Sequence, residues 1–378
     1  MKILYLLTWY QIGDGVSNAI YNQIINKKKW DEYIVVAKWV KSYQKDLNIY
    51  QYKKSDIINV FLEKKIDLIH YFKGNSSDIL NKVLKEMHKQ NLKIPVITTI
   101  CQKPSFKTLL LSPFEIHNSN QFVFIDKASY NDKFIQFIPT SLRHQIYFSP
   151  TEELINKTAN IQYKDNDKGG IIYGRGSTIS KCPSDMFEVF DNIDVPNKEF
   201  HIVGIPRDGN WVHKEALKRH NVKFYGFLPY EEWFDVCKTF DVVLYQIPEE
   251  SHASIDGNLG LPMLMKKPSV YYGSEAPKER FINGVNGFIA NNKKEISYYA
   301  TLLGKNFELR KRMGEKARET TISNFSYKKK MSLYEKVYHE ATLYDNVKIR
   351  IPLSYYIIYV CRCYRRIIQE TFGIYRKH

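Results

Sequence analysis

Long hydrophobic runs, closely spaced cysteines and acidic residues are scarce in this chain. No apolar stretch approaches the ~20 residues that a membrane-spanning helix needs. The five cysteines, at positions 101, 182, 237, 361 and 363, lack the spacing of a metal site. Their odd number, and the absence of a small-residue cleavage site after the apolar residues 1–12, predict a reducing, cytoplasmic location. The 40 acidic residues are outnumbered by 56 lysines and arginines, and the net charge of +16 predicts an acidic partner: a polyphosphate ligand, an anionic membrane or nucleic acid.

What is present is an alternation of short apolar runs and amphipathic segments. A chain of 378 residues, 44% of them hydrophobic, is long enough for two domains. The pattern predicts strands at 2–9, 33–37, 66–72, 94–100 and 122–125, with helices at 56–65, 76–90 and 127–134 between or after them. Further strands are expected at 199–203, 222–225 and 241–245, and helices from 295 to 340. Repeated strand–helix units predict doubly wound parallel sheets, an α/β fold.

The same pattern predicts how the domains divide. Residues 141–169 contain Pro150 and a polar, glycine-ending run, which is typical of an interdomain linker. We therefore expect a first domain at 1–160 and a second at 161–325. A helix at 326–348 would cross back to the first domain, and a basic aromatic tail would occupy 349–378.

One segment has the composition of an anion site. The apolar run 171–173 is followed by Gly174-Arg175-Gly176, then by Lys181 six residues after the arginine, and then by a helix that opens at Pro183. A planar guanidinium and a mobile ammonium beside a helix start suit a diphosphate. A plain strand–glycine turn with a solvated lysine is the alternative. Gly15 ends a second glycine-rich turn before a helix, where backbone N–H groups can approach an anion.

These segments resemble, in chain order, the retaining glycosyltransferases of the GT-B fold, of the large GT4-like family. The resemblance implies two Rossmann-like domains that face each other across a cleft. It also implies that Arg175, Lys181 and Gly15 bind the diphosphate of a nucleotide-sugar donor, although the family has its lysine five residues after the arginine. Gly226, Phe227 and Leu228 match the segment that passes the nucleobase, and Glu279 is expected near the nucleobase or ribose.

Two further positions match residues of the family near the donor sugar. His70 corresponds to a histidine that points toward the cleft, with a satisfied core histidine as the alternative. Cys101 stands where the family has a histidine, so an imidazole role is lost there. No base is placed beside Cys101 by the sequence, and a small buried thiol is the alternative to a sugar contact.

Residues 248–268 depart from the family pattern. The family has two glutamates eight positions apart in this segment, one for the sugar and one for the ribose. One alignment register puts Gly257 and Met265 at those positions, and another puts Ala253 and Leu261 there, so neither supplies an acid. We expect Asp256 and Asn258 to contact the donor sugar, with an exposed loop carboxylate as the alternative for Asp256. The N–H groups of Gly257 and Gly260 would contact the diphosphate.

The tail after residue 349 is amphipathic. Arg350, Arg362, Arg365 and Arg366 alternate with tyrosine and isoleucine, and Glu370 is its one acid. A helix lying on an anionic membrane has this composition, and so does a helix packed on the first domain. Both interpretations remain open from the sequence.

Together these features predict a glycosyltransferase that moves a sugar from a nucleotide diphosphate to a glycan or lipid-linked acceptor with retention, in surface polysaccharide synthesis. No metal or other cofactor is expected, since the basic pair would offset the diphosphate charge, and no catalytic residue is assigned. The alternatives are a degenerate nucleotide-sugar-binding subunit and a GT-B nucleotide-sugar epimerase. Nucleic acid is not an expected partner, because it leaves the strand-end glycines unexplained.

Overall fold

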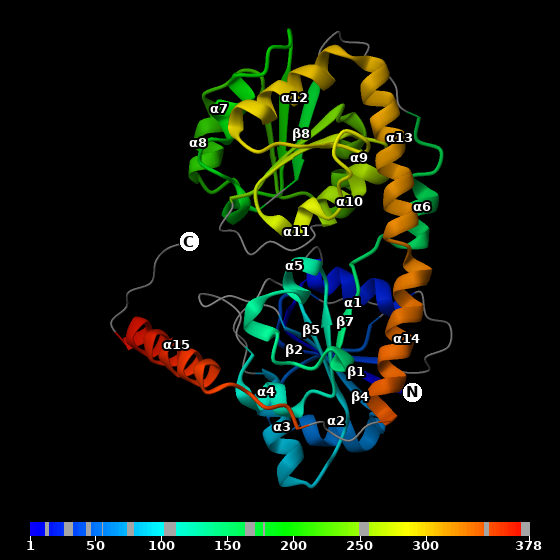
Figure 1. The fold of residues 1–378 in the computed structure, drawn as a ribbon, viewed down its shortest axis with the longest axis vertical. Coiled ribbons are helices and arrows are strands. Elements are labelled where there is room, and N and C mark those ends of the chain that lie inside the picture. The colour runs from blue at the N-terminus through cyan, green and yellow to red at the C-terminus, as the bar shows by residue number, and fades with distance from the viewer. Residues whose placement is uncertain are drawn as a thin grey trace. The chain divides into compact units, whose positions relative to one another are not determined.

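The chain folds into two compact α/β units. The computed structural model describes residues 1–11, 15–25, 33–42, 47–54, 56–73, 79–101, 111–162, 171–176, 178–248, 257–343 and 348–371. Unit 1 consists of Met1–Tyr147 and Lys330–His378, and unit 2 is Phe148–Lys329 (Figure 1). The chain therefore enters unit 2 earlier than the predicted boundary at residues 160–161.

Unit 1 contains a parallel sheet in the order β3-β2-β1-β4-β5-β6-β7. Its strands are β1 (Ile3–Tyr10), β2 (Tyr33–Val40), β3 (Ile49–Gln51), β4 (Leu68–Lys73), β5 (Val96–Ile100), β6 (Gln121–Phe124) and β7 (Arg143–Gln145). Its helices are α1 (Gly15–Ile25), α2 (Ile57–Lys64), α3 (Ile79–Lys89), α4 (Pro113–Asn118), α5 (Lys127–Tyr130) and α15 (Leu353–Thr371), with short 3-10 turns η1 (Lys133–Ile135) and η2 (Thr140–Leu142). Helix α14 (Tyr327–Leu343) begins in unit 2 and continues into unit 1.

Each face of this sheet is buried, which explains why β1 and β4 are almost continuously apolar. Leu4, Ile69 and Tyr71 point to one face, where they pack with α2 and α3. The intervening residues Tyr5 and His70 point to the opposite face, where their rings are in contact and His70 meets Tyr334 and Tyr338 of α14. Successive side chains of a strand alternate between faces, so both helical layers are specified by the same strands.

Unit 2 contains a parallel sheet in the order β10-β9-β8-β11-β12-β13. Its strands are β8 (Ile172–Gly176), β9 (Glu199–Val203), β10 (Val222–Gly226), β11 (Val242–Gln246), β12 (Ser269–Tyr272) and β13 (Phe288–Ile289). Its helices are α6 (Glu152–Lys157), α7 (Met186–Asp191), α8 (Trp211–Leu217), α9 (Tyr230–Thr239), α10 (Gly257–Leu264), α11 (Glu275–Lys278), α12 (Lys293–Lys305) and α13 (Phe307–Asn324), with the 3-10 turn η3 (Ile179–Lys181).

Two hydrophobic clusters cover the two faces of this second sheet. Tyr173 and Leu244 pack with α7, α8 and α12 on one face. Val243 and Tyr245 point the other way and pack with α9 and α10. The predicted α/β class, with doubly wound parallel sheets, is confirmed in both units.

The segment predicted as a linker, 141–169, holds more structure than expected. Strand β7 pairs with β6 at the edge of the first sheet, and α6 follows with Thr151 as its N-cap, whose hydroxyl accepts from the Leu154 N–H at 3.1 Å. The three-residue β7 is polar and lies at an edge, so it carries no hydrophobic signal. Residues 163–170 lie outside the described residues.

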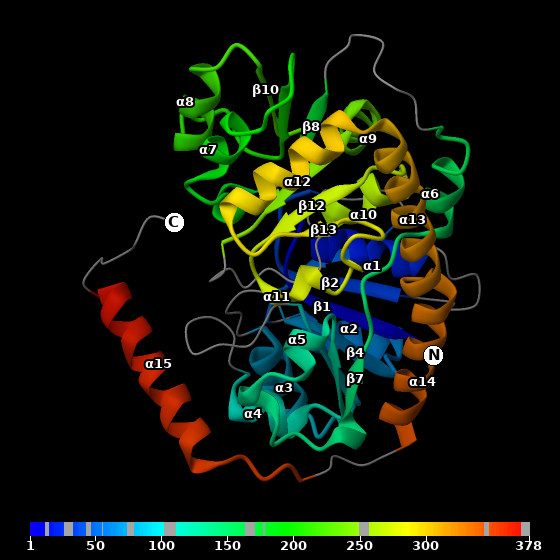
Figure 2. The same cartoon turned by 45° about the horizontal axis from the view of Figure 1, so that its top comes forward.

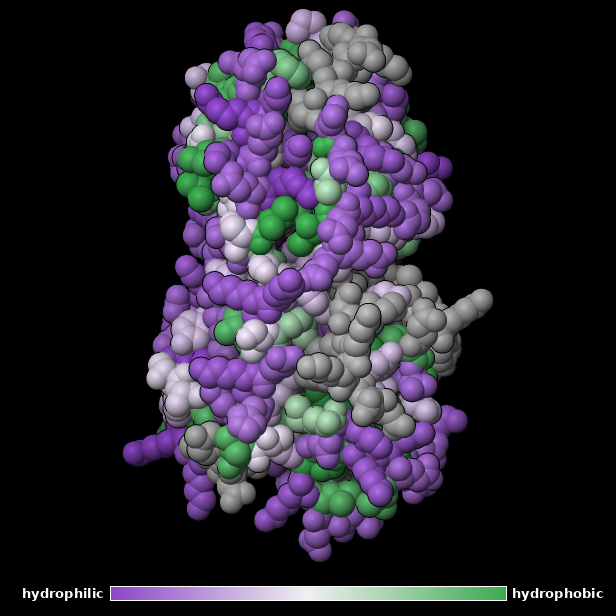
Figure 3. Space-filling view, turned by 90° about the vertical axis from the view of Figure 1, so that its right-hand side faces the viewer, coloured by the Kyte–Doolittle hydropathy of each residue, from purple (hydrophilic) through white to green (hydrophobic). Residues whose placement is uncertain are grey.

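In both sheets the strand order reverses at one point, between β1 and β4 in unit 1 and between β8 and β11 in unit 2. In open α/β sheets, ligands bind at the carboxyl ends of the strands beside such a reversal. On the face that Figure 3 shows, hydrophilic residues dominate and hydrophobic ones form separate patches.

Candidate functional site

Arg175 lies at the strand-order reversal of unit 2, one residue before the end of β8, and its side chain is fully buried. Its Nη2 donates hydrogen bonds to the carbonyl oxygens of Lys181 at 2.6 Å and Gln246 at 2.5 Å. Its Nη1 donates to the carbonyl oxygen of Leu244 at 3.5 Å. The guanidinium thus bridges the ends of β8 and β11 and the end of η3.

This buried cation is only partly satisfied. Within the described part of the chain its Nε–H has no hydrogen-bond partner, and no carboxylate there forms an ion pair with it. Beside it, Gln246 is also fully buried, and neither its side-chain nitrogen nor its side-chain oxygen has a partner among the described residues. Burying a charge without an opposite charge is costly, so this arrangement favours an anion.

The glycine before this arginine has a packing role. A Cβ at Gly174 would lie 2.1 Å from a ring carbon of Phe240, the residue that ends α9. The phenyl ring therefore needs a glycine to approach β8. The Gly-Arg pair was predicted as a turn, but both residues belong to β8. Arg175 therefore lies within the strand, near its carboxyl end.

The backbone of Lys181 lies next to the guanidinium of Arg175. It is the last residue of η3, is half-buried, and its carbonyl oxygen accepts from the guanidinium. The two basic residues predicted to share one ligand are therefore brought together in space.

Helix α10 contains the two glycines that were predicted to contact the diphosphate. Gly257 and Gly260 are its first and fourth residues, so both lie in its first turn, where N–H groups point toward the start of the helix. A Cβ at Gly260 would meet no atom within 4 Å, so the packing does not require a glycine there. Asp256 lies outside the described residues, as does the side chain of Asn258.

The residues predicted near the nucleobase and ribose lie after other strands of the same sheet. Gly226 ends β10 with a φ of 78°, a conformation that favours glycine. Phe227 follows it with 59% of its side chain exposed, and Leu228 is half-buried. Glu279 is the half-buried residue that caps the end of α11. These four assignments stay predictions.

In unit 1, His70 is a core residue in this structure. It is the third residue of β4, rather than its end, and its side chain is fully buried. Its Nδ1 lies 2.8 Å from the hydroxyl of Tyr338 and its Nε2 lies 2.7 Å from the hydroxyl of Thr99. Both ring nitrogens are thus engaged within unit 1, which leaves neither for a sugar hydroxyl.

Cys101 follows β5 and is buried, with its thiol 3.9 Å from the carbonyl oxygen of Thr99. It lies near Tyr334 of α14, and burial is the main cause that raises the pKa of that phenol, with Cys101 adding to it. Gly15 is the first residue of α1. These positions keep the predicted order at the strand ends of unit 1, without showing a ligand contact.

A buried ion pair in unit 1 could not be recognised from the sequence. Lys73 ends β4, and its Nζ lies 2.9 Å from Oε1 of Glu115, a residue of α4 that is 1% exposed. The same carboxylate accepts from the Ser112 N–H at 2.6 Å and completes the capping box of α4. Gln246, the other residue that was missed, was recognisable only as the last residue of a strand.

A second buried lysine lies on α14. Burial lowers the pKa of Lys330 to about 7.

Among the described residues, no group of three or more histidine, cysteine, aspartate or glutamate side chains could hold a metal ion. In the same part of the chain, no helix has the length and apolar character needed to cross a bilayer.

The two parallel sheets and their strand orders define the GT-B fold, two Rossmann-like units in one chain. HepE of Anabaena, solved with UDP, is similar, with a TM-score of 0.68 and 15% identity over 89% of this chain and 99% of that one. A glycosyltransferase of Rickettsia africae gives a TM-score of 0.69 and 13% identity over 91% and 99%. WaaG, a glycosyltransferase involved in lipopolysaccharide biosynthesis, gives 0.60 and 11% over 90% and 100%. No family model matches the chain, and no curated protein matches its sequence.

Proposed function

We propose that this chain is a glycosyltransferase that moves a sugar from a nucleotide diphosphate donor to a glycan or lipid-linked acceptor. The observation that carries the proposal is the buried Arg175 at the strand-order reversal, which has no carboxylate partner in the described part of the chain. A donor diphosphate would supply the missing negative charge. The similar HepE has also been solved with UDP-glucose, which supports a nucleotide-sugar donor.

In this proposal residues of unit 2 hold the diphosphate, and the family resemblance adds Gly15. Arg175 and Lys181 supply positive charge, and the N–H groups of Gly257 and Gly260 supply the positive end of α10. Gly15 contributes its N–H at the start of α1. Charge on the leaving diphosphate increases as the glycosidic bond breaks, so preorganised cations and N–H donors stabilise the transition state more than the ground state.

The remaining assignments follow the family resemblance. Asp256 and Asn258 contact the donor sugar, and Gly226, Phe227, Leu228 and Glu279 line the nucleobase and ribose. Transfer proceeds with retention, with the leaving phosphate as base and without a metal ion. We place the activity in surface polysaccharide synthesis, in the cytoplasm or on the cytosolic face of a membrane.

A donor panel tests the proposal. Unfolding temperature is measured with UDP, GDP, ADP, CMP and the sugar conjugates of each, and slow hydrolysis of the conjugates is followed in parallel. One nucleotide diphosphate should raise the unfolding temperature, because a ligand that binds only the native state stabilises it by mass action. If no nucleotide raises it, the diphosphate site does not exist.

A catalytically degenerate binding subunit is the second candidate. It is favoured by the sequence of α10, where two alignment registers leave both glutamate positions of the family without an acid. Donor binding without any hydrolysis or transfer, for every conjugate that binds, would favour this candidate.

The acceptor side of the proposal rests on α15. Four apolar residues recur along it at helical spacing and are exposed: Leu353, Ile357, Val360 and Tyr364, at 75%, 54%, 48% and 65%. Opposite them Tyr355 is buried, and its hydroxyl donates to the carbonyl oxygen of Leu111 at 2.9 Å. The first turns of α15 thus pack on the core of unit 1 while an apolar stripe remains uncovered; Figures 1 and 2 show the helix starting near α4 and extending away from the sheet of unit 1.

An anionic membrane fits this stripe. The chain around it carries four arginines between residues 350 and 366, against the single Glu370. Each basic residue near an anionic surface contributes about 1 kcal/mol, and burial of the apolar stripe adds to the binding. We propose that α15 holds the enzyme at the membrane, where a lipid-linked acceptor would be found.

Sedimentation with vesicles that contain phosphatidylglycerol tests this step. Ile357→Ser with Val360→Ser should reduce binding at least about tenfold, because the apolar face is lost. Leu62→Ser, at an exposed position of α2, is the matched control and should bind as the wild type does. Equal sedimentation of all three proteins would refute the membrane contact.

Point variants are preferable to truncation here. Ile349 and Ile351 are buried in the same cluster as Tyr355, together with Ile116 and Phe122 of unit 1. Removal of residues after 348 is therefore expected to expose this core and to lower the unfolding temperature, whatever the role of the exposed stripe.

A further inference from the structure

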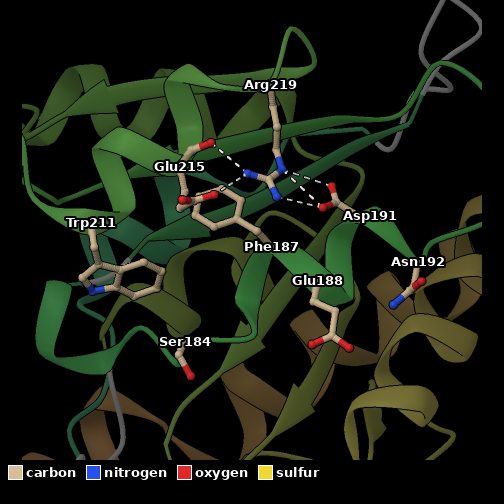
Figure 4. Close-up of a pocket in the computed structure, with 8 residues that line it drawn as sticks. All are labelled: Ser184, Phe187, Glu188, Asp191, Asn192, Trp211, Glu215 and Arg219. Atoms are coloured by element: carbon tan, nitrogen blue, oxygen red, sulfur yellow. Dashed lines mark hydrogen bonds and ion pairs between the residues drawn. The ribbon is translucent and has the colours of Figure 1, made fainter.

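A groove of about 460 Å³ lies between α7 and α8 on unit 2 (Figure 4). In an α/β unit of this kind the helices start at the carboxyl edge of the sheet. Ser184 and Trp211 therefore mark the end of the groove that is nearer the edge carrying Arg175, and Asp191 and Arg219 mark the other end. None of the lining residues belongs to the proposed diphosphate site.

The first wall of the groove is aromatic. Phe187 is 3% exposed and belongs to the core of unit 2, so it forms a fixed floor. Trp211, the first residue of α8, stands edge-on to it, with ring centroids 6.3 Å apart and an interplanar angle of 86°. The indole remains 36% exposed, which leaves ring surface for a ligand.

The second wall is polar and is held in place. Arg219 donates from Nη2 to Oδ2 of Asp191 at 2.8 Å and from Nη1 to Oε2 of Glu215 at 3.1 Å. Its Cζ also lies 4.6 Å from the ring centroid of Phe187. On α7, Glu188 is paired with Lys293 at 2.7 Å. Each carboxylate therefore has a defined orientation and keeps further lone pairs for hydroxyl donors.

The charge of the lining selects among ligands. The carboxylates of Glu188, Asp191 and Glu215 line the groove, and each is paired with a cation: Lys293, Arg219 and Lys218 respectively. Hydrogen bonds from Lys218 and Arg219 lower the pKa of Glu215, so this carboxylate stays ionised at neutral pH. Although the chain as a whole is strongly basic, these three cations are already paired with carboxylates, so the groove offers an anionic ligand no net positive charge.

We propose that this groove binds a neutral or amino-bearing oligosaccharide. The C–H face of a pyranose ring would stack on Trp211, and its hydroxyl groups would donate to Asp191, Glu188 and Glu215. The inference rests on the proposed function in one respect, since a glycan held here would be part of the acceptor. Binding to the groove would then select acceptors by a segment distant from the bond that is formed.

Binding of the full chain to an array of neutral, amino-bearing and acidic glycans tests the proposal. The wild type should retain neutral or amino-bearing glycans and no acidic ones. Trp211→Ala should weaken retention at least about tenfold, Trp211→Phe should restore most of it, and Glu215→Gln should weaken it by a smaller factor. Tyr298→Ala, at a 62% exposed position of α12, is the control and should behave as the wild type.

Three results would overturn the inference: retention of no neutral or amino-bearing glycan, equal retention of acidic glycans, or unchanged retention by Trp211→Ala. Unfolding curves of each variant show that the fold is kept. Calorimetry with UDP, run in parallel on the same proteins, separates the two hypotheses. Loss of glycan binding with intact UDP binding concerns the groove alone, whereas failure of the wild type to bind any nucleotide diphosphate concerns the proposed function.

Discussion

The replacement Arg175→Met separates an anion-binding arginine from a structural one. Without ligand, the variant loses three hydrogen bonds to carbonyl oxygens, each worth about 1 kcal/mol. It also loses a fully buried cation, whose desolvation costs several kcal/mol. Since these effects oppose each other, we expect the free energy of unfolding of the ligand-free protein to change by less than about 2 kcal/mol.

Ligand binding should respond much more strongly. The Nε–H of Arg175 and one remaining Nη1–H can each form a charged hydrogen bond to a phosphate oxygen, worth about 1.5–3 kcal/mol. Loss of both should weaken binding by about 3 kcal/mol or more, roughly a hundredfold. At a UDP concentration that stabilises the wild type by about 2.7 kcal/mol, the variant should then gain only about 0.4 kcal/mol.

Arg310→Met is the matched control. Arg310 is also buried, and its Nη1 donates to the carbonyl oxygens of Leu303 and Gly304 at 2.8 and 2.7 Å, away from the strand-order reversal. This variant should keep the UDP affinity of the wild type in calorimetry, and by the same opposing effects its free energy of unfolding should change little. If Arg175→Met binds every nucleotide diphosphate as the wild type does, its guanidinium serves only to join the strand ends, and the anion site is refuted.

Further variants test the packing of the two units. Gly273→Ala should cost several kcal/mol in a urea titration, because φ is +130° and a Cβ would lie 1.8 Å from a carbonyl oxygen, whereas Gly260→Ala should fold as the wild type does. Lys73→Met should cost about 3–5 kcal/mol by leaving a buried carboxylate unpaired, and adding Glu115→Leu should recover part of the loss; full additivity would contradict the pairing. Burial lowers the folded-state pKa of Lys330 to about 7, so the unfolded chain binds an extra proton above pH 7. The free energy of unfolding of the wild type should therefore rise above pH 7 relative to that of Lys330→Met. A constant difference between the two free energies from pH 6 to pH 9 would contradict this.

The sequence predicted the elements that carry a strong apolar pattern. The runs at 199–203 and 241–245 became β9 and most of β11, since buried parallel strands are apolar on both faces. The short strands β3 and β7 were missed, because each pairs on one side only and has few buried side chains to mark it. For α15, the alternative of a helix packed on the first domain agrees with the burial of Tyr355, while membrane binding by the exposed side stays a prediction.

The candidate site was less predictable, because burial depends on segments far apart in the sequence. The alternative role weighed for His70, a satisfied core histidine, agrees with its bond to Tyr338, 268 residues later. The residues near His70 in the sequence do not indicate that partner. The pairing of Arg175 with the end of β11 likewise required the three-dimensional strand order, although the nearness of Lys181 was evident from the sequence.

The order of the units along the chain has a consequence for synthesis on the ribosome. Unit 2 is one continuous segment, whereas unit 1 is closed only by residues after Lys330. Until the residues after Lys330 have been synthesised, Thr99 and His70 lack the α14 side chains that cover them. We therefore expect unit 2 to reach its native state first. The amino-terminal part of unit 1 should stay incompletely folded, and bind chaperones, until the residues after Lys330 have been synthesised.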